Sequence, residues 1–271
     1  MPPSESDSAK ALRVEDAGPV RTLLIDDPPR NRMSMAFMDA LEAELPRIAA
    51  KPELRAVVIR GAGEEHFSVG MDLKELPRGI ERMGSADAVF DQRLRVLAAL
   101  ENLGKPVIAV LCGYCLGGGL ELPLACHFRL AAAEGARIGL PEMDLGAVPA
   151  WGGSARLTRV VGAHHALDLI LRAKKISGPE AYRIGLVHEV WPNAELFDRA
   201  QELGQELAAM PAGAVAGMLR CIVGAHERSL AENLAAERRE VLACFGTPDQ
   251  REGFMAFLEK RKPVFNRELD D

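Results

Sequence analysis

The fold of this chain depends on the stretch Tyr114-Cys115-Leu116-Gly117-Gly118-Gly119-Leu120-Glu121, which a second stretch, Gly139-Leu140-Pro141-Glu142, complements. Glycines let backbone N–H groups come close to a ligand. A helix that opens on such a turn directs those donors, and its positive end, toward developing negative charge. One carboxylate on that helix and a second from a nearby loop suit general acid–base chemistry beside a stabilised oxyanion.

Length and composition restrict the class of protein. The 271 residues are 48% hydrophobic and 27% charged, which is enough for one large domain, alone or with an appendage. The formal net charge of −6 argues against nucleic acid as the main partner. No apolar run reaches the roughly 18 residues of a membrane span, so we expect no membrane partner. Residues 1–10 lack the apolar stretch of a signal peptide, which predicts a flexible tail and a cytoplasmic protein.

The five cysteines indicate reduced thiols rather than a disulfide framework, because the number is odd and the chain is of medium length. Cys112 and Cys115 form a C-x-x-C pair, for which a redox or metal role is one reading. No second such pair and no nearby pair of histidines accompanies it, so we favour small buried residues. The sequence therefore predicts neither a metal nor a redox cofactor.

Strand and helix patterns alternate over the first 160 residues. Ser34 is a candidate helix cap, and the segment from Pro77 to Ser85, with its glycines, is expected to be a mobile loop. The alternation predicts an α/β body. Strands are expected over 20–25, 55–60, 107–111 and 128–132, and helices over 35–49, 86–103 and 118–125.

After about residue 160 the pattern becomes helical. Ser229 and Glu232 have the spacing of a capping box. The sequence therefore predicts a helical C-terminal region attached to the α/β body. Helices are expected over 163–172, 178–184, 194–210, 214–225, 229–245 and 248–260.

Four ordered blocks resemble the enoyl-CoA hydratase/isomerase superfamily, also called the crotonase family, over about residues 14–265. The blocks are 66–74, 105–122, 139–157 and 251–262. The resemblance implies an α/β fold made of a spiral of ββα units, with the active site in a core over residues 11–195. It also implies a C-terminal helical region over 196–271 that assembles the chain into a homotrimer or a dimer of trimers. The implied substrate is an acyl-CoA thioester, with coenzyme A part of the substrate and no further cofactor.

The resemblance also assigns roles to site residues. The backbone N–H groups of Met71 and Gly118 would form an oxyanion hole for an enolate-like intermediate. Glu121 would help to activate water for attack at C3, and Glu142 would deliver a proton to C2. Because a donating carboxyl must be protonated, burial and the neighbouring carboxylate are expected to raise one pKa. The two groups would titrate as a coupled pair.

Further positions would bind the rest of the substrate. Arg30, Lys74 and Lys105 are candidates for the coenzyme A phosphates from the body of the chain. Phe257 and Lys260 resemble positions that reach the cofactor of a neighbouring subunit. For each of these, a solvated surface charge, or a core aromatic for Phe257, is the other reading.

The chain departs from the family pattern after Glu142. Ala150 replaces a glycine whose backbone lies near the catalytic water in the family, and its Cβ restricts the backbone. Trp151, one of only two tryptophans, is a candidate wall of the acyl pocket, or else a packing residue. A dienoyl-CoA isomerase would be expected to carry an aspartate where this chain has Ala150, which counts against that activity.

The leading hypothesis is an enoyl-CoA hydratase, a lyase that adds water reversibly to a 2-enoyl-CoA thioester. Another reaction of the same family, such as double-bond isomerisation, decarboxylation or thioester hydrolysis, is the alternative. A scaffold that binds an acyl-CoA or a protein without catalysis is a third reading, against which the two glutamates and the glycine turn argue. The sequence leaves the acyl group open.

Overall fold

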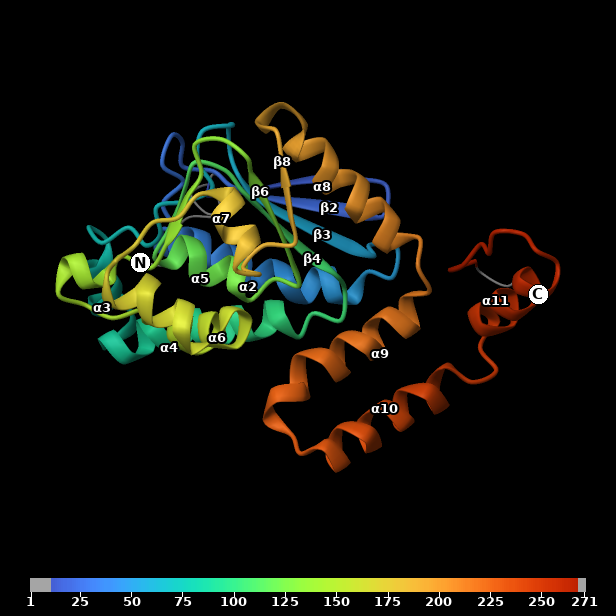
Figure 1. The fold of residues 1–271 in the computed structure, drawn as a ribbon. Helices are drawn as coiled ribbons and strands as arrows, with labels where there is room; N and C mark the ends of the chain where they lie inside the picture. The colour runs from blue at the N-terminus through green and yellow to red at the C-terminus, as the bar shows by residue number, and fades with distance from the viewer. Residues whose placement is uncertain (1–10, 268–271) are drawn as a thin grey trace.

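A six-stranded sheet forms the centre of the molecule (Figure 1). The computed structural model describes residues 11–267, so the predicted tail over residues 1–10 lies outside the described residues. The strand order is β1-β2-β3-β4-β6-β8, with β1 antiparallel to β2 and all other neighbours parallel. The parallel strands β2, β3 and β4 are almost entirely buried, as strands covered on both faces must be. The strands are β1 (Leu12–Ala17), β2 (Val20–Ile25), β3 (Ala56–Gly61), β4 (Val107–Leu111), β6 (Phe128–Ala132) and β8 (Glu189–Trp191).

Helices cover both sides of this sheet. Figure 1 shows α2 and α8 on opposite sides, and α8 packs against β2, β3, β4, β6 and β8. Ser34 caps α2 by accepting a hydrogen bond from the Phe37 N–H, as the sequence predicts. The helices of the body are α2 (Met35–Ala50), α3 (Leu76–Met83), α4 (Ala86–Glu101), α5 (Gly118–Leu124), α6 (Gly153–Leu171), α7 (Gly178–Arg183) and α8 (Asn193–Ala208).

A small second sheet carries the two stretches that opened the sequence analysis. Its strands, β5 (Tyr114–Leu116) and β7 (Arg137–Gly139), run parallel. The chain passes from β5 into the glycine turn and α5, and from β7 toward the 3₁₀ helix η1 (Glu142–Leu145). Because the two strands run in the same direction, their ends bring Gly117 and Glu142 to the same edge.

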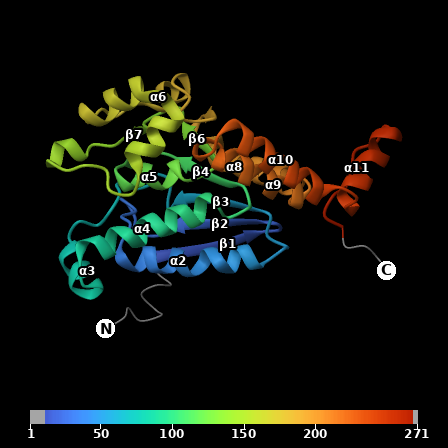
Figure 2. The ribbon, with the colours of Figure 1, turned by 90° about the horizontal axis from the view of Figure 1, so that it is seen from below.

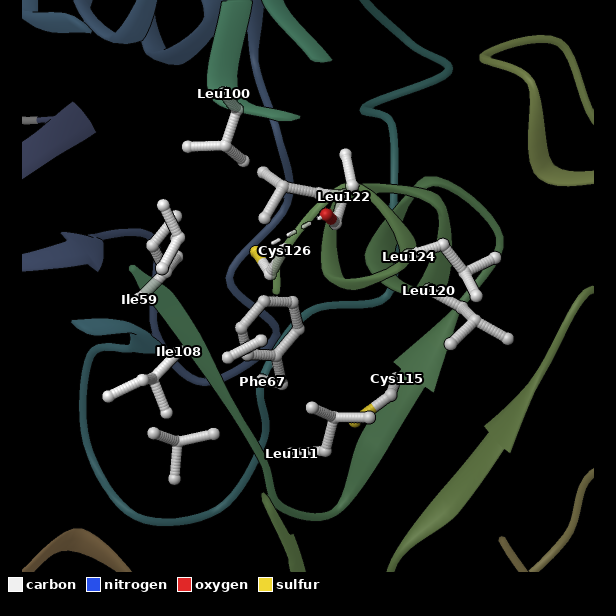
Figure 3. Close-up of a cluster of buried hydrophobic side chains, with 14 of the residues drawn as sticks. Ile59, Phe67, Leu100, Ile108, Leu111, Cys115, Leu120, Leu122, Leu124 and Cys126 are labelled. Atoms are coloured by element: carbon white, nitrogen blue, oxygen red, sulfur yellow. Dashed lines mark hydrogen bonds between the residues drawn. The ribbon is translucent and has the colours of Figure 1, made fainter. Parts of the chain in front are cut away.

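The core beneath α5 is apolar (Figure 3). Cys112, Cys115 and Cys126 are all buried in it, which confirms the reading of the C-x-x-C pair as small buried residues. Burial raises the pKa of the Cys112 thiol to about 11 and that of Cys126 to about 12. These thiols therefore stay protonated near neutral pH and are poor nucleophiles.

The α/β alternation and the helical C-terminal half are confirmed, with corrections to single elements. Most of the segment from Pro77 to Ser85, expected to be a mobile loop, belongs to α3, because Pro77 lies in the first turn of the helix and Gly84 ends it in the left-handed region at φ 89°. α6 begins at Gly153 and not near residue 163. Gly162, at φ 76°, interrupts the helix, so the sequence pattern predicts only the segment that follows it. The strands β1, β5, β7 and β8 were missed.

Three helices extend from the body as a C-terminal arm, which comprises α9 (Ala212–Val223), α10 (Leu230–Cys244) and α11 (Pro248–Leu258) (Figures 1 and 2). α9 packs against α10, and Ser229 and Glu232 form the predicted capping box. The predicted division between residues 195 and 196 falls inside α8, which packs on the sheet. Across residues 11–267 no single helix has the length and apolar composition to cross a membrane. The arm exposes large apolar side chains, namely Ile222, Leu234, Val241, Leu242, Phe245, Phe254, Phe257 and Leu258.

Candidate active site

The glycine turn at the start of α5 is packed too tightly for other residues. Gly117 has φ 56°, and its N–H donates to the Gly139 carbonyl at 3.1 Å, which joins the turn to β7. A Cβ atom on Gly119 would collide with the backbone of Ser68, whose carbonyl carbon would lie 2.9 Å away. A Cβ atom on Gly70 would lie 3.1 Å from the Gly118 nitrogen. The segment around Gly70 therefore lies directly against the first turn of α5.

Two backbone N–H groups are free at this junction. The Gly70 N–H donates to Ser68 Oγ at 3.0 Å, and the Met33 N–H donates to the Gly70 carbonyl at 2.8 Å. Neither Met71 nor Gly118 donates a turn, loop or cap hydrogen bond within residues 11–267. Gly118 is the first residue of α5, where N–H groups have no partner inside the helix. The predicted pair of oxyanion donors is thus brought together and available.

Glu121 is buried in α5, with only 2% of its surface exposed. Its Oε1 accepts hydrogen bonds from the Trp151 N–H at 2.7 Å and the Gly153 N–H at 2.8 Å. Burial raises the pKa of Glu121 from 4.5 to about 7; the two N–H groups and the charge of Arg156 oppose this, and the charge of Glu142 adds to it. A carboxyl group in this state exchanges protons near neutral pH.

Glu142 begins η1 and lies beside the glycine turn. A Cβ atom on Gly117 would be 3.0 Å from Glu142 Oε1. The Oε2 atom of Glu142 is buried and has no hydrogen-bond partner within the described part of the chain. Burial also raises the pKa of the Glu142 carboxyl group. An unsatisfied buried oxygen costs free energy unless a ligand or water binds it. Both predicted glutamates therefore lie near the glycine turn, where the charge of Glu142 acts on Glu121, and each has a raised pKa.

The indole of Trp151 packs against the glycine turn. It lies over Gly118, where a Cβ atom would come within 2.6 Å of Cη2 and 3.0 Å of Cε3. The side chain is only 2% exposed, so Trp151 is a packing residue as well as a neighbour of the oxyanion donor. Ala150, before it, is partly buried and packs against the core.

The predicted coenzyme A contacts divide into two groups. Arg30 and Lys74 are both exposed; the Arg30 carbonyl accepts the Val69 N–H at 3.1 Å, and Lys74 follows Met71 by three residues in the sequence. Lys105 is a correction, because its Nζ donates to the carbonyls of Ile48 at 2.5 Å and Lys51 at 2.6 Å. Lys105 therefore binds the C-terminal end of α2 instead of a phosphate.

Phe257 and Lys260 do not join the site of their own chain. Both are exposed, Phe257 to 82%, and they belong to or directly follow α11 in the C-terminal arm. Figures 1 and 2 show α11 far from α5. Phe257 and Lys260 therefore lie away from the glycine turn of their own chain.

Comparison with known proteins places the chain. The family model described as enoyl-CoA hydratase/isomerase matches residues 16–268. The chain belongs to this family. A probable enoyl-CoA hydratase of Bacillus subtilis is 36% identical over 250 residues, which cover 92% of this chain and 96% of the relative. A probable enoyl-CoA hydratase of Rhizobium meliloti is 36% identical over 259 residues, 95% of this chain and 98% of the relative.

Solved structures of the family have the same fold. An enoyl-CoA hydratase from Bacillus anthracis superposes with a TM-score of 0.89 at 33% identity, covering 95% of this chain and 100% of that one. One from Geobacillus kaustophilus gives a TM-score of 0.90 at 30% identity, covering 95% and 97%. These similarities confirm the predicted family and its crotonase-like α/β fold, and the predicted enzyme class at the level of the family.

Sequence reasoning missed two side chains that support the turn bonded to Glu121. Arg156 donates to the Trp151 carbonyl and to Glu101, and so contacts the turn that holds Glu121. Arg156 lies within one of the blocks that carry the family resemblance, which was the available signal. Glu101 had none, because a glutamate at the end of a helix is usually a solvated residue.

Proposed function

We propose that this protein is an enoyl-CoA hydratase, which adds water reversibly across the double bond of a 2-enoyl-CoA thioester. The observation that carries the proposal is the buried Glu121, held by two N–H groups, beside Glu142 and two free backbone donors. Family membership supports a hydro-lyase acting on an acyl-CoA.

The oxyanion donors supply most of the proposed transition-state stabilisation. As water attacks C3, negative charge moves to the thioester oxygen, which the N–H groups of Met71 and Gly118 would stabilise by donating hydrogen bonds to it. Loss of one such donor typically costs about 3–4 kcal/mol of transition-state stabilisation. Because both donors belong to the backbone, side-chain replacement at Met71 leaves the donor in place.

The two glutamates would handle the protons. Glu121, with a pKa of about 7, is partly ionised at neutral pH and takes a proton from the attacking water. Glu142, whose pKa burial raises, donates a proton to C2. The new bonds are C3–O and C2–H, and the proton taken by Glu121 balances the one that Glu142 gives. Dehydration follows the reverse path.

The remaining contacts concern coenzyme A and a second subunit. Arg30 and Lys74, both exposed, would bind the phosphates. Phe257 and Lys260 would reach the coenzyme A of a neighbouring subunit. The exposed apolar side chains of the C-terminal arm support a homo-oligomer, a trimer or a pair of trimers, because a monomer rarely exposes so many. We propose no further cofactor and a cytoplasmic location.

A panel of acyl-CoA thioesters tests the proposal. The purified protein is incubated with 2-enoyl, 3-enoyl, malonyl-type and cyclic dienoyl thioesters, and mass spectrometry follows gain or loss of water. We expect hydration of a 2-enoyl thioester, and a fall of at least about a hundredfold in both Glu121→Gln and Glu142→Gln. Glu206→Gln, on the exposed side of α8, is the matched control and keeps full activity.

Three results contradict the proposal. Full activity in either active-site variant removes the two-glutamate mechanism. A shifted double bond, lost carbon dioxide or free coenzyme A as the main product assigns another reaction of the family. Binding of thioesters that raises the melting temperature without turnover indicates a scaffold.

A further inference from the structure

A partly buried ion pair supports the turn that holds Glu121. Arg156, in the first turns of α6, donates from Nη1 to the Trp151 carbonyl at 2.9 Å. Its Nε and Nη2 donate to Glu101 Oε2 at 3.2 and 2.9 Å. Glu101 is the last residue of α4, so the guanidinium ties the end of one helix to the loop that precedes another.

The ion pair is shielded from solvent. The side chains of Arg156 and Glu101 are 13% and 21% exposed, well below the exposure of most ion pairs in the body. Breaking such a pair costs more than breaking a surface pair, because the remaining charge stays poorly solvated. Gly152 has φ 90°, and a Cβ atom there would lie 2.5 Å from Arg156 Nη1. The guanidinium therefore packs directly against the backbone of the turn.

We infer that Arg156, held by Glu101, is a positioning residue that fixes the Trp151–Gly153 turn and through it the place and proton affinity of Glu121. The turn supplies both hydrogen bonds that Glu121 receives. Without the guanidinium, the carbonyl of Trp151 loses its partner and both N–H donors lose their fixed direction. The expected effect on hydration kinetics rests on the proposed function, whereas the expected effect on the position and titration of Glu121 does not.

Two charged side chains act on Glu121 from the elements around it. Glu142 on η1 favours the protonated carboxyl group, and Arg156 on α6 favours the ionised one. Removing Arg156 thus acts twice in one direction: it removes a positive charge and loosens two N–H donors. Both changes make ionised Glu121 less stable, so its titration moves to higher pH.

Trp151 provides a readout that needs no substrate. The chain has two tryptophans, and Trp191 lies on β8, with its Nε1 bonded to Glu189. In a Trp191→Phe background the tryptophan fluorescence comes from Trp151 alone, whose backbone N–H donates to Glu121. We expect a fluorescence transition near pH 7 that Glu121→Gln abolishes. A transition that survives Glu121→Gln contradicts the coupling of Trp151 to Glu121.

Three variants in that background test the inference. Arg156→Met removes the charge and the donors at similar size, and its fluorescence midpoint should rise. Arg156→Lys keeps the charge but has a single nitrogen, so its midpoint should lie between those of Arg156→Met and the parent. Arg159→Met is the matched control: it lies three residues further along α6 and pairs weakly with Glu227 on the surface. Its midpoint should equal that of the parent.

Kinetics give the second readout. For hydration at pH 7 we expect Arg156→Met to lower kcat about tenfold or more while KM changes by less than about threefold, with Arg156→Lys recovering part of kcat. A midpoint that stays at the parent value in both Arg156 variants overturns the inference, whatever their melting temperatures. If no 2-enoyl thioester is hydrated, the proposed function fails, and the fluorescence midpoints still decide whether Arg156 positions Glu121.

Discussion

Glu121→Gln should make the protein more stable at alkaline pH. Glutamine is nearly isosteric with glutamate, and its Oε1 can still accept the N–H groups of Trp151 and Gly153. The substitution therefore keeps the hydrogen bonds and removes the charge. Burial of the ionised carboxylate destabilises the folded state of the natural chain, and the substitution removes this destabilisation.

The size of the effect follows from the pKa. Glu121 titrates at about 7 in the folded chain and at about 4.5 when exposed. At about 1.4 kcal/mol for each pKa unit, ionised Glu121 destabilises the native state by roughly 3 kcal/mol. The folded chain holds the proton more tightly than the unfolded chain. The stabilising contribution is thus complete below pH 4.5 and is lost as the pH rises through about 7.

Denaturant unfolding of the two proteins at matched concentration measures this difference. The free energy of unfolding of Glu121→Gln minus that of the natural chain should be near zero at about pH 4.5 and approach roughly 3 kcal/mol above about pH 8. Holding the concentration constant removes any contribution from subunit association. Glu206→Gln, at an exposed position, should show no such pH-dependent difference. A difference that does not vary with pH, or one that favours the natural chain at high pH, would refute the burial argument.

Three further substitutions test separate parts of the site. Gly118→Ala places a Cβ atom within 2.6 Å of the Trp151 ring, so we expect a loss of about 1–3 kcal/mol in stability and of hydration activity, whereas Gly213→Ala, with open space around it, loses neither. Trp151→Phe should shift kcat/KM toward 2-enoyl thioesters with bulkier acyl groups; an unchanged order across a graded series would exclude Trp151 as a wall of the acyl pocket. Leu242→Asp, on the exposed face of α10, should reduce the oligomer observed by sedimentation, and an unchanged sedimentation coefficient would place the interface elsewhere.

The sequence predicts the glycine turn from local spacing, whereas Met71 and Glu142 are predicted from the family resemblance. Gly117 to Glu121 form a turn and the start of a helix within a few residues, so their spacing alone places a carboxylate near free N–H donors. The contact between Arg156 and Glu101 joins residues 55 positions apart and depends on how α4 and α6 pack. No local pattern reveals it, since both residues resemble ordinary charged helix positions.

Helices were mispredicted where a single glycine or proline is compatible with either a loop or a helix. Pro77 and Gly84 suggested a loop, yet a proline in the first turn and a glycine just after the last are also typical of a short helix. Gly162 hid the first half of α6 in the same way. Lys105 resembled a phosphate ligand, whereas the fold directs it to the carbonyl end of α2. Tertiary packing decides each of these cases.

The stereochemistry of water addition tests the central proposal most directly. Hydration of a 2-enoyl-CoA thioester in D₂O places deuterium at C2 and oxygen at C3, and NMR gives their relative configuration. Since the proposed mechanism activates water at Glu121 and delivers the proton from Glu142, and both residues lie near the glycine turn, we predict that both atoms arrive on the same face. Addition on opposite faces, or a mixture of the two products, would contradict a mechanism in which these two carboxyl groups deliver water and proton together.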